Sequence, residues 1–407
     1  MNKRVFSFFL AIIAIAVIVG YRLFDSRYEW DLGVVPVEEY VTEHAIASAS
    51  RYHSFVIKPD GSLWGWGGNE YGQLGDGTTN SHDEPIMIMS DIVYVSANHR
   101  RTFAIDGDGT LWAWGNNARG QLGDGTTEDR FSPVPIMQNV SAVASSSDHT
   151  IVIRTDGSLW GFGNRRGLGW NISATGDREA FRKYPIHLMD DIIDIAAGVT
   201  YSLVLKNDGT LWAFGGNNEG QLGDGTARDR DNPIQVLDNV TAVAAGTFHS
   251  AAIRTDGSLW TWGSNNFGQL GDVRGTRRTT PERVLENVAT VSLGAFHTLA
   301  LKEDGSLYSF GSSMSGQLGR EHITTVTIFR RIPGISRIRR WEIDEVRVYI
   351  NWEPEKIMSS VAYISAGDQH TLVVRRDGSI WAFGDNRENQ LGVSSIRENT
   401  IVPVRLF

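Results

Sequence analysis

The chain has 407 residues, 10% of them aromatic and 44 of them Gly, and its formal net charge is −9. An acidic chain of this kind lacks the overall basic surface that nucleic-acid binding requires, so we expect no nucleic-acid partner. The sequence contains no Cys, which excludes disulfides and thiolate metal sites.

The N-terminus has the composition of a membrane-targeting segment. Lys3 and Arg4 precede an apolar run over residues 5–20, which is longer than most signal-peptide cores and shorter than a typical spanning helix. No small-residue cleavage site follows, so we expect a signal anchor over residues 1–24, with a cleaved signal peptide (a secreted protein) or a buried helix as alternatives. Residues 25–35 would form a short stem. The basic flank predicts a single-pass protein of the cell membrane with the remaining chain extracytoplasmic.

A short motif recurs seven times from residue 60 onward. Each copy has an Asp-Gly pair, then aromatic residues at alternate positions, then Gly, and successive copies are 48, 48, 52, 48, 48 and 73 residues apart. The Asp residues of the seven copies are Asp60, Asp108, Asp156, Asp208, Asp256, Asp304 and Asp377. Alternation of large apolar residues is the pattern of a β-strand with a buried face, and a repeat of this length is typical of propellers and solenoids.

The unit around Asp256 predicts four strands. Residues 240–245 and 249–254 form the first two, an Asp-Gly turn leads to the third at 259–262, and the fourth begins at Pro281. Four strands in each of seven units predict an all-β, seven-bladed β-propeller over residues 36–407. We further expect the C-terminal VPVRLF to supply the outer strand of the first blade, so that both chain ends share one sheet and no edge is left exposed.

Two units are longer than the others, and both insertions precede the predicted fourth strand. One lies near residues 164–184, and the other occupies residues 320–353, where Pro333-Gly334 divides two β-rich runs and predicts a protruding hairpin. The longer insertion is locally basic and aromatic, a composition typical of interface anchors. The candidate partner-binding residues are Arg330, Arg331, Arg337, Arg339, Arg340, Trp341, Tyr349 and Trp352. The alternative is a solvated loop that packs on the sixth blade.

The repeat resembles that of the regulator of chromosome condensation family. The resemblance rests on Gly246, His249, the Asp256-Gly257 pair, Trp260, Gly263, Asn265 and the GQLG run at 268–271. It implies a seven-bladed propeller. Family members act as exchange factors for a small nuclear GTPase, plant ultraviolet sensors, ubiquitin-ligase modules and secreted bacterial β-lactamase inhibitors. This chain has no basic nuclear tail and lacks the Gly-Trp-Arg-His-Thr motif of the photoreceptor, so it looks like a bacterial-type, surface-anchored member.

One position of the repeat is His in five copies. These are His53, His149, His249, His297 and His370, with Arg101 and Tyr201 at the same position in the other two. Because they lie one per unit without accompanying carboxylates, we expect structural rings that hydrogen-bond local backbone, not metal ligands. The Asp-Gly pairs lack the final Glu of a calcium loop, and no P-loop, HExxH or GxSxG motif is present. We therefore expect no enzyme activity, catalytic residue, metal, cofactor or small-molecule substrate.

These features predict a membrane-anchored, extracytoplasmic propeller that serves as a scaffold for a protein partner. An inhibitor of a cell-envelope enzyme such as a β-lactamase is the alternative that the resemblance implies. Guanine-nucleotide exchange on a small GTPase rests on the resemblance alone, and an extracytoplasmic location would disfavour it.

Overall fold

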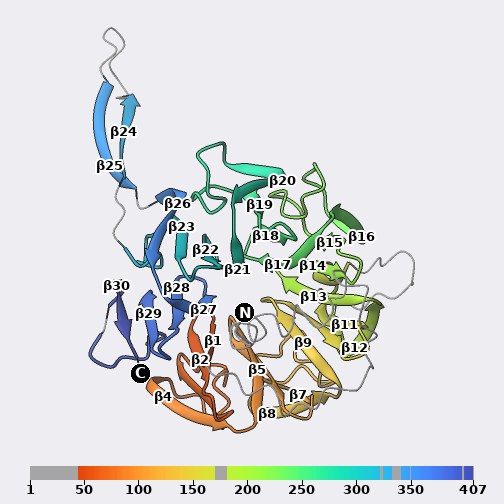
Figure 1. Ribbon diagram of the computed structural model, residues 1–407. Helices are drawn as coiled ribbons and strands as arrows, with labels where there is room; N and C mark the ends of the chain where they lie inside the picture. The colour runs from red at the N-terminus through yellow and green to blue at the C-terminus, as the bar shows by residue number, and fades with distance from the viewer. Residues whose placement is uncertain are drawn as a thin grey trace, which may run out of the picture.

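The computed structural model describes residues 45–169, 181–320, 324–331, 341–348, 350–396 and 398–406. In this part of the chain, seven four-stranded antiparallel sheets follow one another around a central axis (Figure 1). The first strand of each sheet lies nearest the axis and the fourth lies at the rim. The predicted seven-bladed β-propeller of four-stranded blades is confirmed.

Each blade is built from one continuous stretch of chain. Blade one contains β1 (Ile46–Ala49), β2 (His53–Ile57), β3 (Leu63–Gly67) and β4 (His82–Met89); blade two contains β5 (Ile92–Asn98), β6 (Arg101–Asp106), β7 (Leu111–Gly115) and β8 (Arg130–Met137). Blade three contains β9 (Val140–Ser145), β10 (His149–Arg154), β11 (Leu159–Asn164) and β12 (Phe181–Met189), with the short 3₁₀ helix η3 (Arg165–Leu168) after β11. Blade four contains β13 (Ile192–Ala197), β14 (Tyr201–Lys206), β15 (Leu211–Gly215) and β16 (Arg230–Leu237).

The remaining three blades follow the same order. Blade five contains β17 (Val240–Ala245), β18 (His249–Arg254), β19 (Leu259–Ser264) and β20 (Arg277–Leu285); blade six contains β21 (Val288–Leu293), β22 (His297–Lys302), β23 (Leu307–Ser312) and β26 (Ile350–Met358). Blade seven contains β27 (Val361–Ala366), β28 (His370–Arg375), β29 (Ile380–Gly384) and β30 (Thr400–Arg405). The strands β24 (Thr324–Arg331) and β25 (Trp341–Val348) form a separate two-stranded sheet.

The hydrophobic core lies between blades. Between blades seven and one, for example, Trp66 and Val56 of blade one pack with Leu372 and Val374 of blade seven, and all four side chains are buried. A blade buries its apolar faces only against its neighbours, so stability depends on a closed ring.

The prediction that the C-terminus completes the first blade is wrong. Strand β30 pairs with β29 and completes blade seven, whereas blade one takes its outer strand, β4, from its own unit. Pro403 follows Asp377 by nearly the same interval at which Pro281 follows Asp256, so the loop after β29 returns the chain to its own blade. The ring closes instead through side chains and loops where β1 and β27 meet (Figure 1).

Two hydrogen bonds join blade one to blade seven at this closure. The Ala49 N–H donates to Ser365 Oγ at 2.9 Å, and the Trp66 Nε1–H donates to the Gln390 carbonyl at 2.9 Å. Each bond joins blade one to blade seven without exchanging a strand.

The predicted hairpin in the longer insertion is confirmed. Strands β24 and β25 pair antiparallel from Thr324↔Val348 to Arg331↔Trp341 and extend away from the disc beside blade six (Figure 1). In the part of the chain that the structure describes, no helix is long and apolar enough to cross a membrane. The predicted anchor, residues 1–24, and stem, residues 25–35, lie outside the described residues.

Candidate functional site

The two faces of the propeller have different chemistry. In every blade, the connections from first to second strand and from third to fourth strand lie on one face, because the strands alternate in direction. This face, the loop face, carries the GQLG runs and both insertions. The opposite face, the turn face, carries the tight Asp-Gly turns and the connections between blades.

The Asp-Gly pairs on the turn face are turn residues. Asp256 Oδ1 accepts a hydrogen bond from the Ser258 N–H at 2.9 Å, and Gly257 has φ of +74°. Hydrogen bonds from the Ser258 hydroxyl and amide lower the pKa of the Asp256 carboxyl. Among the described residues, no group of three or more His, Asp or Glu side chains is arranged to hold a metal ion.

The repeated His residues form links between neighbouring blades. Nε2 of His53 lies 2.9 Å from the Thr102 hydroxyl of the next blade, and Nε2 of His370 lies 2.9 Å from the Ser54 hydroxyl across the closure. The other pairs are His149–Ser202, His249–Thr298 and His297–Thr371, at 2.9, 3.1 and 3.2 Å. The expectation that these rings bond local backbone is therefore corrected, because Nε2 contacts a hydroxyl of the adjacent blade.

The tautomer of each ring follows from its hydroxyl partner. The Thr102 hydroxyl donates its one proton to the Gln73 carbonyl at 2.8 Å, so it accepts from the His53 Nε2–H. Burial lowers the pKa of His53 to about 3, and it likewise lowers the pKa of His149, His249 and His297 to about 3 and that of His370 to about 4. All five rings are therefore neutral at physiological pH.

The two exceptions make the same link with a different side chain. The Arg101 guanidinium donates to the carbonyls of Ser146 and Ser147 in blade three, each at 2.5 Å. The Tyr201 hydroxyl donates to the His249 carbonyl of blade five at 2.6 Å. Together with the His residues, these side chains form a continuous ring of blade-to-blade hydrogen bonds, which we call the belt.

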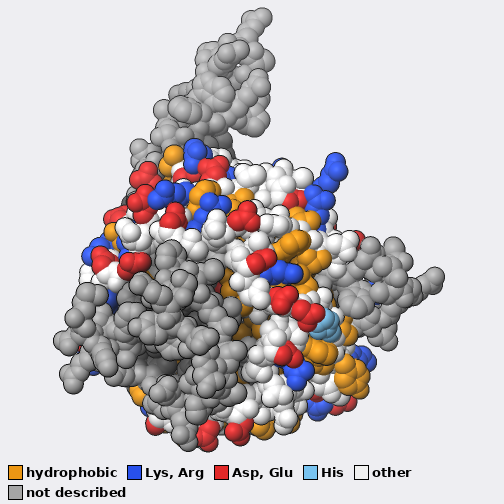
Figure 2. All heavy atoms as spheres, turned by 45° about the vertical axis from the view of Figure 1, so that its right-hand side comes forward, with side chains coloured by type: hydrophobic (Ala, Val, Ile, Leu, Met, Phe, Trp, Pro, Cys, Tyr) orange, Lys and Arg blue, Asp and Glu red, His pale blue; other side chains and the backbone are white. Residues whose placement is uncertain are grey.

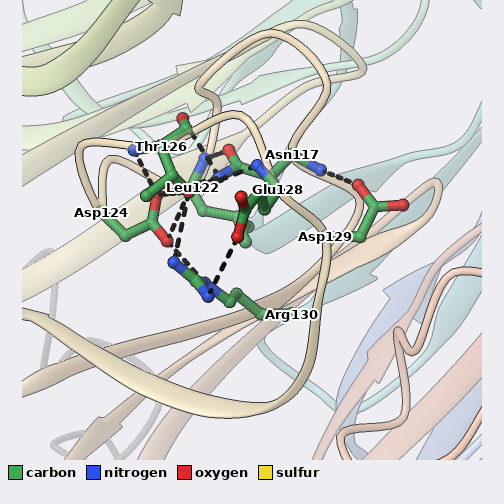
Figure 3. A network of polar contacts seen from close by, with 7 residues as sticks. All are labelled: Asn117, Leu122, Asp124, Thr126, Glu128, Asp129 and Arg130. Atoms are coloured by element: carbon green, nitrogen blue, oxygen red, sulfur yellow. Dashed lines mark hydrogen bonds and ion pairs between the residues drawn. The ribbon is translucent and has the colours of Figure 1, made fainter.

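The loops that carry GQLG are held by internal polar networks. In blade two, Asp124 Oδ1 accepts from the Asn117 side-chain amide at 2.9 Å and from the Thr126 N–H at 2.9 Å (Figure 3). Its Oδ2 accepts from Arg130 Nε at 2.7 Å, and Asp129 accepts from the Asn117 N–H at 2.7 Å (Figure 3). Such a network fixes the loop backbone, so the side chains it presents are preorganised.

A single variable position on the loop face precedes each belt residue. Around the ring its occupants are Tyr52, Arg100, Asp148, Thr200, Phe248, Phe296 and Gln369. Phe248 is exposed and the other six are partly exposed. The belt thus fixes seven equivalent positions, and the side chains at these positions differ from blade to blade.

The chemistry of this position divides the loop face. On blades five and six the rings of Phe267 and Phe296 pack 4.8 Å apart, and nearby Phe248 and Met314 are 36% and 68% exposed. On blades one to three the surface is charged and aromatic, and Arg119 pairs there with Asp148. The loop face therefore carries an apolar cluster on blades five and six and a charged, aromatic surface on blades one to three.

The central channel opens on the loop face. Its mouth is a cavity of about 120 Å³ lined mainly by small residues such as Ala49, Ala97 and Gly246, with Asp368 at its edge. Further along the channel wall, Asp194 of β13 accepts from the Val243 N–H at 3.0 Å, and burial raises the pKa of its carboxyl to about 7.

The predicted partner-binding residues fall into three groups. Arg330 and Arg331 lie in β24 and Trp341 lies in β25, where Arg331 pairs with Trp341 and Arg330 with Glu342. Arg337, Arg339, Arg340 and Tyr349 lie outside the described residues. Trp352 lies in β26, is half-buried and approaches the blade-five loop at Gly268, so it belongs to the propeller wall.

The sequence interpretation missed the variable position before the belt. Its members are dispersed, one per unit, and no single unit reveals them. An alignment of the seven units on the belt residue would have found the variable position, because the residue before the belt residue differs in almost every unit.

Charges are mixed on one face of the molecule. Acidic and basic side chains are interspersed over the described part of the face in view (Figure 2). Mixed charge of this kind does not form the basic stripe typical of nucleic-acid binding.

Comparisons with known proteins agree with this architecture. The RCC1-like domain family matches residues 167–407, and regulator of chromosome condensation repeats match residues 60–105 and 108–153. The probable E3 ubiquitin-protein ligase HERC6 of Homo sapiens is 55% identical over 38 residues, which are 9% of this chain and only 4% of that protein.

Solved structures of the same fold cover most of the chain. The structure of Kap60 bound to yeast RCC1 (Prp20) aligns with a TM-score of 0.71 at 20% identity, over 95% of this chain and 90% of that one. Prp20p from Saccharomyces cerevisiae, described with its binding to Gsp1p and histones, aligns with a TM-score of 0.71 at 21% identity, over 93% of this chain and 91% of that one. Human WBSCR16 aligns with a TM-score of 0.69 at 19% identity, over 85% of this chain and 94% of that one. The chain belongs to the regulator of chromosome condensation family of RCC1-like β-propellers.

Proposed function

We propose that the chain is a protein-binding platform whose loop face makes the contacts. The observation that carries the proposal is the variable position before the belt. A fixed hydrogen-bonded scaffold presents seven side chains of different chemistry on one face, which is how binding surfaces are built on rigid folds. The exposed Phe248 and Met314 add apolar anchors to that face.

The hairpin of β24 and β25 is the second contact element in this proposal. It belongs to a loop-face connection, and in the described residues its strands pair only with each other. A lone two-stranded hairpin is marginally stable in water and gains stability from a partner. Two of the solved structures, both of the yeast protein Prp20, name protein partners in their descriptions: Kap60 in one, and Gsp1p and histones in the other. These partners support a protein partner here.

We also propose that the platform is tethered to the cell membrane through residues 1–24, with the propeller extracytoplasmic. The support is the apolar run over residues 5–20 with its basic flank. Reporter fusions at the C-terminus test this: an extracytoplasmic reporter should be active, and activity of a cytoplasmic reporter alone would overturn the topology.

The hairpin proposal is tested by removing the hairpin while keeping blade six. A variant in which a Gly-Ser linker replaces residues 322–348 retains β26 and its pairing with β23. Crosslinking in the native cell followed by mass spectrometry should recover fewer partners from this variant than from the wild type. Identical partner sets, with an unchanged melting temperature, would remove the hairpin from the proposed contact surface.

A further inference from the structure

Four side chains on the loop face of blades one and two form a compact group, which we call the Arg–Tyr cluster. It consists of Arg51 and Tyr52 from the β1–β2 loop, Tyr71 from the loop after β3, and Arg100 from the β5–β6 loop. The Arg100 guanidinium carbon lies 4.2 Å from the Tyr71 ring centre and 5.8 Å from that of Tyr52, while Arg51 lies 5.0 Å from the Tyr52 ring. The two guanidinium groups therefore stack on the two tyrosine rings.

Arg100 is not neutralised by a carboxylate in the part of the chain that the structure describes. Among the described residues, no carboxylate forms an ion pair with it, whereas Arg119 pairs with Asp148 and Arg387 pairs with Asp385 at 2.5 Å. Within the same described residues Arg51 has one long ion pair, at 3.8 Å from Asp368, and its side chain is 46% exposed. Stacking on an aromatic ring covers the flat face of a guanidinium and leaves its N–H edges available.

The backbone holds Arg100 in place. His99, the residue before it, has φ of +42°, and in the aligned loops of the other blades no described non-glycine residue has a positive φ. The His99 ring also meets the Tyr52 ring edge-on at 6.4 Å. Strain of this kind persists where the surrounding contacts enforce it, and it often accompanies functional sites.

A cavity adjoins the cluster on the side of blade seven. It has a volume of about 160 Å³ and is lined by Arg51, Tyr52, Gln369, Asp385, Arg387 and Glu388. The acidic groups nearby are mostly occupied: Asp385 pairs with Arg387, and Asp368 faces Arg51 and His99. Glu388 and Glu70 remain exposed at the rim.

We propose that the Arg–Tyr cluster is the docking point for an acidic segment of the protein partner, with a Glu or Asp carboxylate bound by Arg100 and Arg51. The planar fork of a guanidinium matches the two oxygens of a carboxylate. The residue next to that carboxylate in the partner occupies the adjoining cavity. Arg and Tyr are also the residues that dominate the energetics of protein interfaces. The inference rests on the proposed function of the loop face and adds the chemistry of the partner.

The net charge of the chain makes the test selective. A protein of charge −9 repels an acidic peptide in general, so binding must come from a local site. The probe is a short fluorescein-labelled peptide of Glu and Gly, with the matching Gln and Gly peptide as the neutral control, and binding to the purified chain is measured by fluorescence anisotropy at low ionic strength.

We expect the Glu peptide to bind more tightly than the Gln peptide and Arg100→Gln to weaken the Glu peptide about tenfold, the loss typical of a charge-assisted hydrogen bond. Tyr71→Ala should weaken binding and Tyr71→Phe should not, because the ring supplies the stacking. Arg283→Gln, an equal change of charge on the outer strand β20 at a side chain that is 48% exposed, is the control and should change nothing.

Three results would overturn the proposal: no preference for the Glu peptide, an equal loss in Arg283→Gln and Arg100→Gln, or no loss in Arg100→Gln. Melting temperatures of all variants confirm that they are folded. If this assay fails while crosslinks to the loop face persist in cells, acid recognition is refuted and the proposed function stands.

Discussion

The five buried His residues of the belt should make the propeller sensitive to mild acid. Their pKa values are lowered by burial to about 3 or 4, while the ordinary value is about 6.5. Between these limits a ring is neutral in the folded chain and takes up a proton on unfolding. Unfolding therefore consumes protons, and stability falls as the pH falls below about 6.5.

The size of the stability loss follows from how far the pH lies below the ordinary pKa of His. At pH 5 each ring has lost about 2 kcal/mol of its contribution, so the five together cost about 10 kcal/mol. Asp194 acts in the opposite direction, because a pKa raised to about 7 means that acid protonates its carboxyl in the folded chain first, which adds about 2 kcal/mol. For these six groups the net loss is about 8 kcal/mol, which is comparable with the whole stability of a typical domain.

Urea unfolding followed by Trp fluorescence at pH 7, 6 and 5 measures this loss. A matched variant is His297→Tyr, because Tyr201 occupies the equivalent place in blade four and Gly294 leaves the space that Gly198 leaves there. The variant should show a smaller dependence of unfolding free energy on pH, by about 1.4 kcal/mol per pH unit. A wild-type midpoint that does not change between pH 7 and 5 would refute the assignment of neutral buried rings, as would an unchanged slope in His297→Tyr.

Two further predictions concern the ring and its turns. Ser54→Ala should lower the unfolding free energy by about 1–3 kcal/mol, because it leaves the buried His370 Nε2 without its partner and removes one of the two hydrogen bonds that the Gln390 carbonyl accepts at the closure. Ser90→Ala, at an exposed position, should have almost no effect, and equal melting temperatures for the two variants would contradict the role of Ser54 in the closure. Gly263→Ala should lower the melting temperature more than Gly378→Ala. Both glycines have positive φ, but an added Cβ would lie 2.5 Å from the Phe248 carbonyl oxygen at Gly263, whereas it would meet nothing within 4 Å at Gly378. Similar losses of melting temperature would show that φ strain alone sets the cost.

The local pattern of each unit was sufficient to predict the blades. The Asp-Gly turn, the alternating aromatics and the Pro of the fourth strand all depend on interactions within about 50 residues, so one unit such as that around Asp256 reveals them. The pairing of β24 with β25 was predictable for the same reason. The predicted start of the fourth strand at Pro281 is wrong, because β20 begins at Arg277 and Pro281 lies inside it.

Contacts between units were harder to predict. The Nε2 partner of His370 is Ser54, 316 residues away, and the sequence offers no local sign of it. The prediction for the closure was wrong because both chain ends carry a Pro near the outer-strand position. Only the path of the loop after β29 shows that the C-terminal strand returns to blade seven. The Arg–Tyr cluster was missed because its members come from three loops of two blades.

Face-resolved photocrosslinking tests the central claim most directly. Phe248 and Thr255 flank the same strand, β18, at its loop-face and turn-face ends, and both are exposed. A photoreactive phenylalanine analogue at each position, irradiated in the native cell, reports which face a partner covers. Our account predicts protein adducts from position 248 and few or none from position 255. Adducts from position 255 alone, or equal adducts from both, would contradict the assignment of the loop face as the binding surface.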